Sequence, residues 1–172
     1  KIQFFGGEPL LRLDLVFAAM DYAEAAAKKA GKTVVFIMTT NTMALTDELR
    51  AKLDKRKVIW ILSFDGDAET QDDQRPMRAG GTRFLPAYEQ IKRIAASGAP
   101  YLVNMTTTPE HSHDTKKNAL RLLDAGVRAI SFGNRMGTDW SDDKAVAYFR
   151  GIQAFLEEAK SRGLILFVLN SV

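Results

Sequence analysis

The first residues with clear chemical potential lie at positions 4–9, which read Phe-Phe-Gly-Gly-Glu-Pro. Two adjacent glycines let the backbone turn sharply and approach a ligand, whereas a turn alone needs only one. The Glu8 carboxylate can accept hydrogen bonds from an ammonium or an amide. Glu8 also suits the start of a helix, with Pro9 at the first helical position. The motif therefore predicts a ligand loop, with helix capping as the alternative.

Small and polar residues follow several other apolar runs, at the point where each run ends. Asn41, Ser63 and Asp65 are the main candidates for ligand binding, although each also suits a turn. The wider set is Thr39, Thr40, Gly66, Asn104, Thr106, Thr107, Ser131, Gly133, Asn134 and Arg135. If the runs are parallel strands, all of these groups share the edge of the sheet where α/β sites are built.

Arg75 and two histidines are further polar candidates. Arg75 follows an acidic stretch at 67–73, so the sequence allows either a surface ion pair with those carboxylates or a guanidinium that reaches a ligand carboxylate or ribose. His111 and His113 lie beside Asp114 in a polar loop, which favours solvation over metal binding. We expect no metal ligands in this chain, and no residue is assigned as a catalytic acid or base.

Short apolar runs alternate with amphipathic segments along the whole sequence, which predicts buried strands and covering helices. The expected strands are Ile2–Phe5, Val34–Met38, Val58–Phe64, Tyr101–Met105, Val127–Phe132 and Leu164–Leu169. Apolar residues at helical spacing predict helices over Leu11–Ala30 (through Leu15, Ala19, Tyr22 and Ala26), Phe84–Ser97 and the segment around Val146–Ala159. Glycines at 31, 98, 126 and 163 are typical of helix C-termini.

We therefore expect residues 1–172 to form one α/β domain, or most of one, with five strand-helix units, a sixth strand, parallel strands and outer helices. A doubly wound sheet and a β/α barrel both fit this alternation. The chain is 46% hydrophobic and 26% charged, as in globular proteins. Its net charge of +3 is spread over helix faces, so we expect no nucleic-acid partner. No apolar run reaches the roughly 20 residues of a membrane span and no leader is visible, so we expect no membrane association and a cytoplasmic protein.

The strand-end motifs resemble those of the radical S-adenosylmethionine enzymes. The Gly-Gly-Glu-Pro sequence at 6–9 is similar to the motif on the second barrel strand of that superfamily. Thr40-Asn41, Leu62–Gly66, Gln74-Arg75, residues 80–84 (Gly-Gly-Thr-Arg-Phe) and residues 134–137 (Asn-Arg-Met-Gly) resemble the SPASM-type, peptide-modifying branch that includes sulfatase-maturating enzymes. The resemblance covers nearly the whole chain and implies a partial radical SAM barrel of about six strands.

This resemblance implies a site for S-adenosylmethionine. Gly6, Gly7 and Glu8 would bind the amino end of the methionine moiety, and Ser63 and Arg75 would reach its carboxylate or the ribose. Two further residues belong to the implied set: the backbone near Met136 would line the adenine, and Asn41 would shape the cavity. The implied reaction is reductive cleavage to a 5′-deoxyadenosyl radical that abstracts hydrogen from a peptide or protein, with a flavodoxin or ferredoxin as electron donor.

The chain departs from the family in having no cysteine. The family holds a [4Fe-4S] cluster through a C-x3-C-x2-C loop after its first strand, and such clusters are held by thiolates. We therefore expect an internal segment of a longer enzyme, with the first strand and the cysteine loop upstream and the auxiliary region downstream. By itself the segment would be inactive.

Two other functions fit the same residues. A barrel that has lost its cluster could bind a peptide or another partner on its polar face. An unrelated β/α-barrel lyase or isomerase could use Asp65 or Glu8 as an acid or base, without iron or S-adenosylmethionine.

Overall fold

The computed structural model describes residues 1–77 and 80–171, with side chains through residue 169. Its described strands form one six-stranded, fully parallel sheet with the order β1-β2-β3-β4-β5-β6. The strands are β1 (Ile2–Phe4), β2 (Phe36–Thr40), β3 (Ile59–Ser63), β4 (Tyr101–Thr107), β5 (Ala129–Asn134) and β6 (Phe167–Ser171). Sequential order is typical of a barrel, because a doubly wound sheet reverses its order partway. The fold is therefore a partial β/α barrel, as expected.

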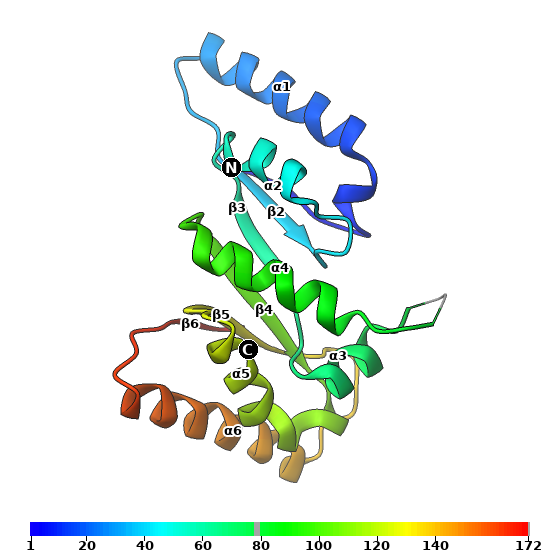
Figure 1. Cartoon of the computed structure of the whole chain (residues 1–172), viewed down its shortest axis with the longest axis vertical. Coiled ribbons are helices and arrows are strands. Elements are labelled where there is room, and N and C mark those ends of the chain that lie inside the picture. Colours follow the sequence, from blue (N-terminus) through cyan, green and yellow to red (C-terminus); the bar gives the residue numbers. More distant parts are fainter. Residues whose placement is uncertain (78–79, 172) are drawn as a thin grey trace.

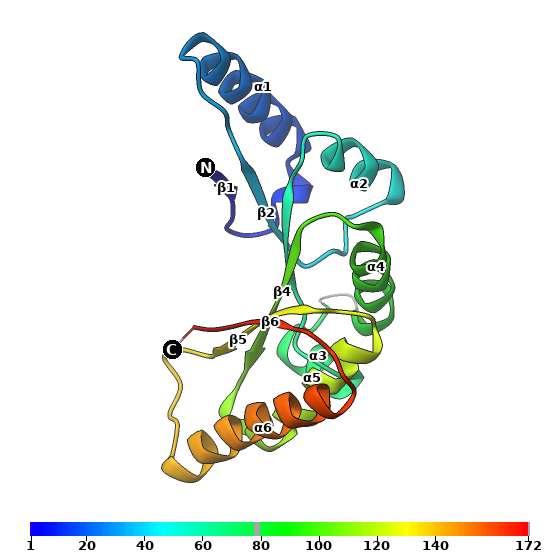
Figure 2. The same cartoon turned by 90° about the vertical axis from the view of Figure 1, so that its left-hand side faces the viewer.

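Helices follow the strands and cover one side of the sheet. They are η1 (Pro9–Leu11), α1 (Leu13–Lys29), α2 (Asp47–Asp54), α3 (Ala68–Gln74), α4 (Phe84–Ser97), η2 (Pro109–Asp114), α5 (Thr115–Asp124) and α6 (Asp142–Ser161), of which η1 and η2 are 3-10 helices. The sheet curves into an arc with the helices on its outer side, and α1 and α6 lie at its two ends (Figures 1 and 2). The inner side stays open.

The core lies between the outer face of the sheet and the helices. Alternate strand residues point to this side, as the two-residue period of a strand requires. Trp60 and Leu62 on β3 are fully buried, and Ile91 and Ile94 of α4 pack into the same cluster. The residues between them, such as Ile61, face the open side and are half-buried. The inner face of the arc is thus free to form a site.

The first helix differs from its sequence prediction in two ways. The chain forms η1 first and breaks at Arg12 before α1 begins. The buried residues of α1 are Val16 and Met20, whereas Leu15 and Tyr22 of the predicted apolar stripe are exposed. Helical spacing finds an apolar stripe, but only packing decides which of two adjacent stripes faces the core.

Candidate functional site

The carboxyl ends of β1, β2 and β3 and the middle of β4 surround one cavity of about 440 Å³. Six of the seven residues predicted to bind the cofactor line it: Gly6, Gly7, Glu8, Asn41, Ser63 and Arg75. Phe5, Thr39, Thr40 and Asn104 complete the lining. A parallel sheet brings these groups together because every strand ends at the same edge. Their role in binding remains a prediction.

The seventh predicted residue, Met136, does not line this cavity. It lies in the loop after β5, where its side chain is 89% exposed. This loop is held by hydrogen bonds that the Trp140 indole N–H and the Thr138 hydroxyl donate to the Arg135 carbonyl. A role of the backbone near Met136 in adenine binding stays a prediction.

The two glycines leave open space at the cavity. Gly6 adopts φ +97°, a conformation that residues with side chains rarely adopt. A Cβ added to Gly6 or Gly7 would meet no atom of the described residues within 4 Å. Packing within the described chain therefore does not require glycine at position 7, and its bare backbone is accessible to a ligand.

Glu8 is held in place by three hydrogen bonds from two elements. Its Oε1 accepts from the Leu10 amide at 3.1 Å and from the Thr40 hydroxyl at 2.9 Å, and its Oε2 accepts from the Asn41 amide at 2.8 Å. The first bond caps η1, so the capping role that the sequence allowed is present. The other two fix the carboxylate against the end of β2. Ionised carboxylates can accept about four hydrogen bonds, so Glu8 keeps capacity for a ligand ammonium.

Asn41 combines cavity lining with a turn. Its side-chain oxygen accepts a hydrogen bond from the Met43 amide at 3.0 Å, which is the turn role that the sequence allowed. The left-handed residue of this turn is Thr42, with φ +66°. The side-chain oxygen of Asn41 therefore serves the turn, and its backbone N–H binds Glu8.

Arg75 pairs with a carboxylate other than those expected. Its Nε and Nη2 donate to Oδ2 and Oδ1 of Asp65 at 2.6 and 3.0 Å, in the two-pronged geometry that favours arginine over lysine. The acidic stretch at 67–73 contributes no ion pair to Arg75 among the described residues. Asp65 is only 2% exposed, which disfavours the alternative in which it acts on a substrate as an acid or base. Arg75 still lines the cavity.

Ser63 and Asn104 are neighbours across β3 and β4 and face the same side of the sheet. Within the described part of the chain, the Ser63 hydroxyl and the Asn104 side-chain amide make no hydrogen bond. The sequence placed Asn104 at a strand end but gave it no role. Asn104 and Thr106 are polar residues two positions apart on one face of β4, and this spacing is the signal that identifies Asn104.

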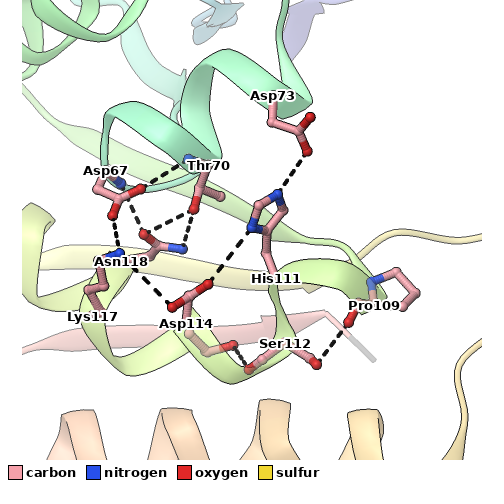
Figure 3. Close-up of polar contacts among 10 residues, drawn as sticks. Asp67, Thr70, Asp73, Pro109, His111, Ser112, Asp114, Lys117 and Asn118 are labelled. Atoms are coloured by element: carbon pink, nitrogen blue, oxygen red, sulfur yellow. Dashed lines mark hydrogen bonds and ion pairs between the residues drawn. The ribbon is translucent and has the colours of Figure 1, made fainter.

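The loop that carries Asp65 is anchored to α5 by a buried polar network (Figure 3). The Asn118 side chain accepts a hydrogen bond from the Asp67 amide and donates one to the Thr70 hydroxyl, both at 3.0 Å. Asp67 caps α3 through the Thr70 amide and pairs with Lys117 at 2.6 Å. Burial raises the pKa of Asp67, but the bonds from Lys117 and Thr70 outweigh burial and hold it below its ordinary value.

His111 belongs to this network. His111 Nε2 lies 2.8 Å from Oδ2 of Asp73, which joins η2 to α3 (Figure 3). The part of the chain that the structure describes contains no group of three His, Cys, Asp or Glu side chains that could hold a metal. With no cysteine in the sequence, these residues do not fit an iron-sulfur cluster.

Comparison with known proteins supports the fold. No family model matches the chain. The uncharacterised protein MJ0907 of Methanocaldococcus jannaschii is 25% identical over 132 residues, which are 77% of this chain and 45% of that protein. A structure of anSMEcpe with bound AdoMet superposes with a TM-score of 0.83 at 15% identity, over 96% of this chain and 46% of that one.

Other solved structures agree. SuiB of Streptococcus suis bound to S-adenosylmethionine gives a TM-score of 0.67 at 14% identity, over 99% of this chain and 37% of that one. A domain of a pyruvate-formate lyase-activating enzyme from Bacteroides vulgatus gives 0.70 at 14% identity, over 99% of this chain and 98% of the domain. The chain has the fold of the radical S-adenosylmethionine enzymes. It spans less than half the length of MJ0907 and of anSMEcpe.

Proposed function

We propose that the 440 Å³ cavity binds S-adenosylmethionine and that the chain is the cosubstrate-binding part of a radical SAM enzyme. One observation carries the proposal: a fixed carboxylate, Glu8, and a fixed guanidinium, Arg75, line the same cavity together with the unpaired Ser63 hydroxyl. An amino acid presents an ammonium and a carboxylate, which are the groups that such a pair complements. The solved structures of the same fold with bound AdoMet support this choice of ligand.

In this proposal Glu8 and the exposed backbone of Gly6 and Gly7 hold the ammonium, and Ser63 and Arg75 hold the carboxylate. Bound there, S-adenosylmethionine supplies the 5′-deoxyadenosyl group that radical SAM enzymes use to abstract hydrogen. Because the chain lacks cysteine, the ligands of the [4Fe-4S] cluster lie outside these 172 residues. The substrate that we propose is a peptide, since anSMEcpe and SuiB have been solved with the Cp18Cys and SuiA peptides. A flavodoxin or ferredoxin as electron donor and a cytoplasmic location belong to the same proposal.

Calorimetry with S-adenosylmethionine tests the site. Replacing Glu8 by Gln keeps the shape and one acceptor but removes the charge, so we expect the dissociation constant to rise about 10- to 100-fold, as for the loss of a hydrogen bond to a charged group. Glu48→Gln, at an exposed position of α2, is the matched control and should bind like the wild type. Unchanged affinity in Glu8→Gln would remove Glu8 from the site. An absence of binding by the wild type would refute the proposal.

The absence of cysteine favours a second candidate, a barrel without a cluster that binds a peptide. The coding sequence upstream of Lys1 distinguishes the two. Three cysteines in a C-x3-C-x2-C loop would establish the radical enzyme, and their absence from the whole reading frame would favour the peptide-binding module.

A further inference from the structure

A buried carboxylate with no assigned function lies directly behind the cavity. Asp65 is 2% exposed, and its two oxygens accept three hydrogen bonds: two from Arg75 and one from the Thr106 amide at 3.0 Å. A buried charge is tolerated only when it is paired and hydrogen-bonded. Asp65 is thus bound at once to Arg75 and to β4.

The backbone around Asp65 is equally constrained. The Asp65 amide donates to the side-chain oxygen of Gln71 at 2.8 Å, which ties the loop to α3. Gly66 adopts φ +144°, and a Cβ there would overlap the side chain of Asn118. The carboxylate is therefore bound to Arg75 and β4, and its backbone is fixed by α3 and packs against α5, before any ligand arrives. A flexible loop could not orient an arginine in this way.

The ion pair with Asp65 uses two of the three guanidinium nitrogens of Arg75. Nε and Nη2 are bound by Asp65, whereas Nη1 makes no hydrogen bond within the described residues. Arg75 lines the cavity and its side chain is 25% exposed. Nη1 therefore keeps both of its hydrogens for an anionic group in the cavity. An unpaired arginine would have to lose much of its rotamer freedom upon binding.

We infer that Asp65 is a positioning residue, which fixes the guanidinium of Arg75 so that Nη1 is presented to the carboxylate of the cosubstrate. The inference rests on the proposed function and adds to it a residue that does not itself contact the ligand. Asp65 acts on one part of the ligand only, the carboxylate. Replacing Asp65 should therefore change the ratio of the affinities for ligands with and without a carboxylate.

The test compares S-adenosylmethionine with its decarboxylated analogue, by calorimetry on the wild type and on Asp65→Asn. Asparagine has the same shape but cannot accept both prongs of the guanidinium. We expect Asp65→Asn to bind S-adenosylmethionine about tenfold more weakly and to bind the analogue as the wild type does. Asp67→Asn, in the same loop but paired with Lys117, is the matched control and should keep the wild-type ratio of the two affinities.

Three outcomes separate the possibilities. Equal weakening for both ligands would mean that Asp65 only supports the fold, which overturns the inference. Unchanged affinity for S-adenosylmethionine overturns it as well. A wild type that binds neither ligand refutes the proposed function instead. If Asp65→Asn does not fold, nitrogen-15 NMR of the ligand-free wild type gives the answer, because a positioned Arg75 shows restricted guanidinium rotation and free rotation would overturn the inference.

Discussion

At the scale of single residues, the cavity depends on side chains that hold other side chains. Glu8 and Arg75 carry the charges, while Thr40 and Asp65 fix them from buried positions. Thr40 is 2% exposed, and its hydroxyl donates to Glu8 and accepts from the Thr42 amide at 3.0 Å. Preformed charges bind a ligand with less loss of conformational entropy.

We predict that Thr40→Val lowers both stability and cosubstrate affinity. Valine has nearly the shape of threonine, but it leaves the buried Thr42 amide without its acceptor, at a cost of about 1–3 kcal/mol, and it frees one side of Glu8. Urea unfolding and calorimetry with S-adenosylmethionine measure the two effects. Thr40→Ser retains the hydroxyl and should keep the affinity. A Thr40→Val protein with wild-type affinity would show that Glu8 does not need this support.

Tyr148 offers the opposite case, a buried polar group without a partner. It is 2% exposed, it packs against Trp140 and Phe149, and its hydroxyl has no hydrogen-bond partner among the described residues. Burial raises the pKa of Tyr148 to about 12. We predict that Tyr148→Phe matches or exceeds the wild-type free energy of unfolding, by up to about 1 kcal/mol, because an unsatisfied hydroxyl is removed.

The same residue gives a dependence on pH. The Tyr148 pKa is higher in the folded state than in the unfolded chain, so the unfolded chain loses the phenol proton at a lower pH. The free energy of unfolding therefore does not depend on this ionisation below about pH 10 and falls as the pH rises towards about 12. Unfolding curves of the wild type and Tyr148→Phe should therefore diverge further in this window, in favour of the variant. A difference in the free energy of unfolding that stays constant from pH 9 to 12 would contradict a raised pKa of Tyr148.

At the scale of elements, the short helix α3 connects the cavity to the outer layer. Asp67 caps it, Gln71 binds the Asp65 amide, and Arg75 follows its last residue. Asp65 precedes this seven-residue helix and Arg75 follows it, so the two ends of α3 determine whether their side chains meet. Displacement of α3 would separate them.

We predict that the contribution of Asp67 to stability vanishes in acid. Its pKa is lowered in the folded state, so the ionised carboxylate stabilises the fold above the unfolded value of about 3.9, and this stabilisation is lost as the pH falls through the folded pKa. Asp67→Asn can still cap α3, so it should be less stable by roughly 1 kcal/mol at pH 7. The difference from the wild type, measured by urea unfolding, should shrink below pH 4. A constant difference would mean that the ion pair with Lys117 is irrelevant.

Sequence pattern predicted the elements better than their contacts. Alternating apolar runs found every described strand, and α4 has the predicted bounds. The exposed stripe of α1 was mistaken for its core face, because Leu15 and Tyr22 repeat with the same period as the buried Val16 and Met20. Local patterns carry the period of an element but not the orientation of its neighbours.

For the site, too, the sequence predicted the positions of residues but not their contacts. Strand-end positions and the resemblance placed six predicted residues around one cavity. The pairs that hold them could not be predicted, because Glu8 meets Thr40 across 32 residues and Arg75 meets Asp65 instead of the nearer acids at 67–73. Pairing depends on where α3 and β2 end in space, and the sequence pattern does not contain that information.

At the scale of the whole molecule, the arc has two open ends. Strands β1 and β6 each pair on one side only within the described chain, and the termini lie on the open side of the sheet (Figure 2). An apolar groove of about 490 Å³ runs between β1 and α1. None of the helices among the described residues has the length and apolar character needed to cross a membrane.

We predict that the 172-residue protein self-associates through the β1 end. Unpaired strand edges and contiguous apolar surface promote association, and here Phe5 is 76%, Leu15 56% and Tyr22 78% exposed. Light scattering should give a mass above the 19.1 kDa of one chain, and the mass should fall in Leu15→Lys because a charge enters the groove. Ala25→Lys adds the same charge to an exposed position of α1 outside the groove and should leave the mass unchanged. A monodisperse monomer of the wild-type protein would contradict the prediction.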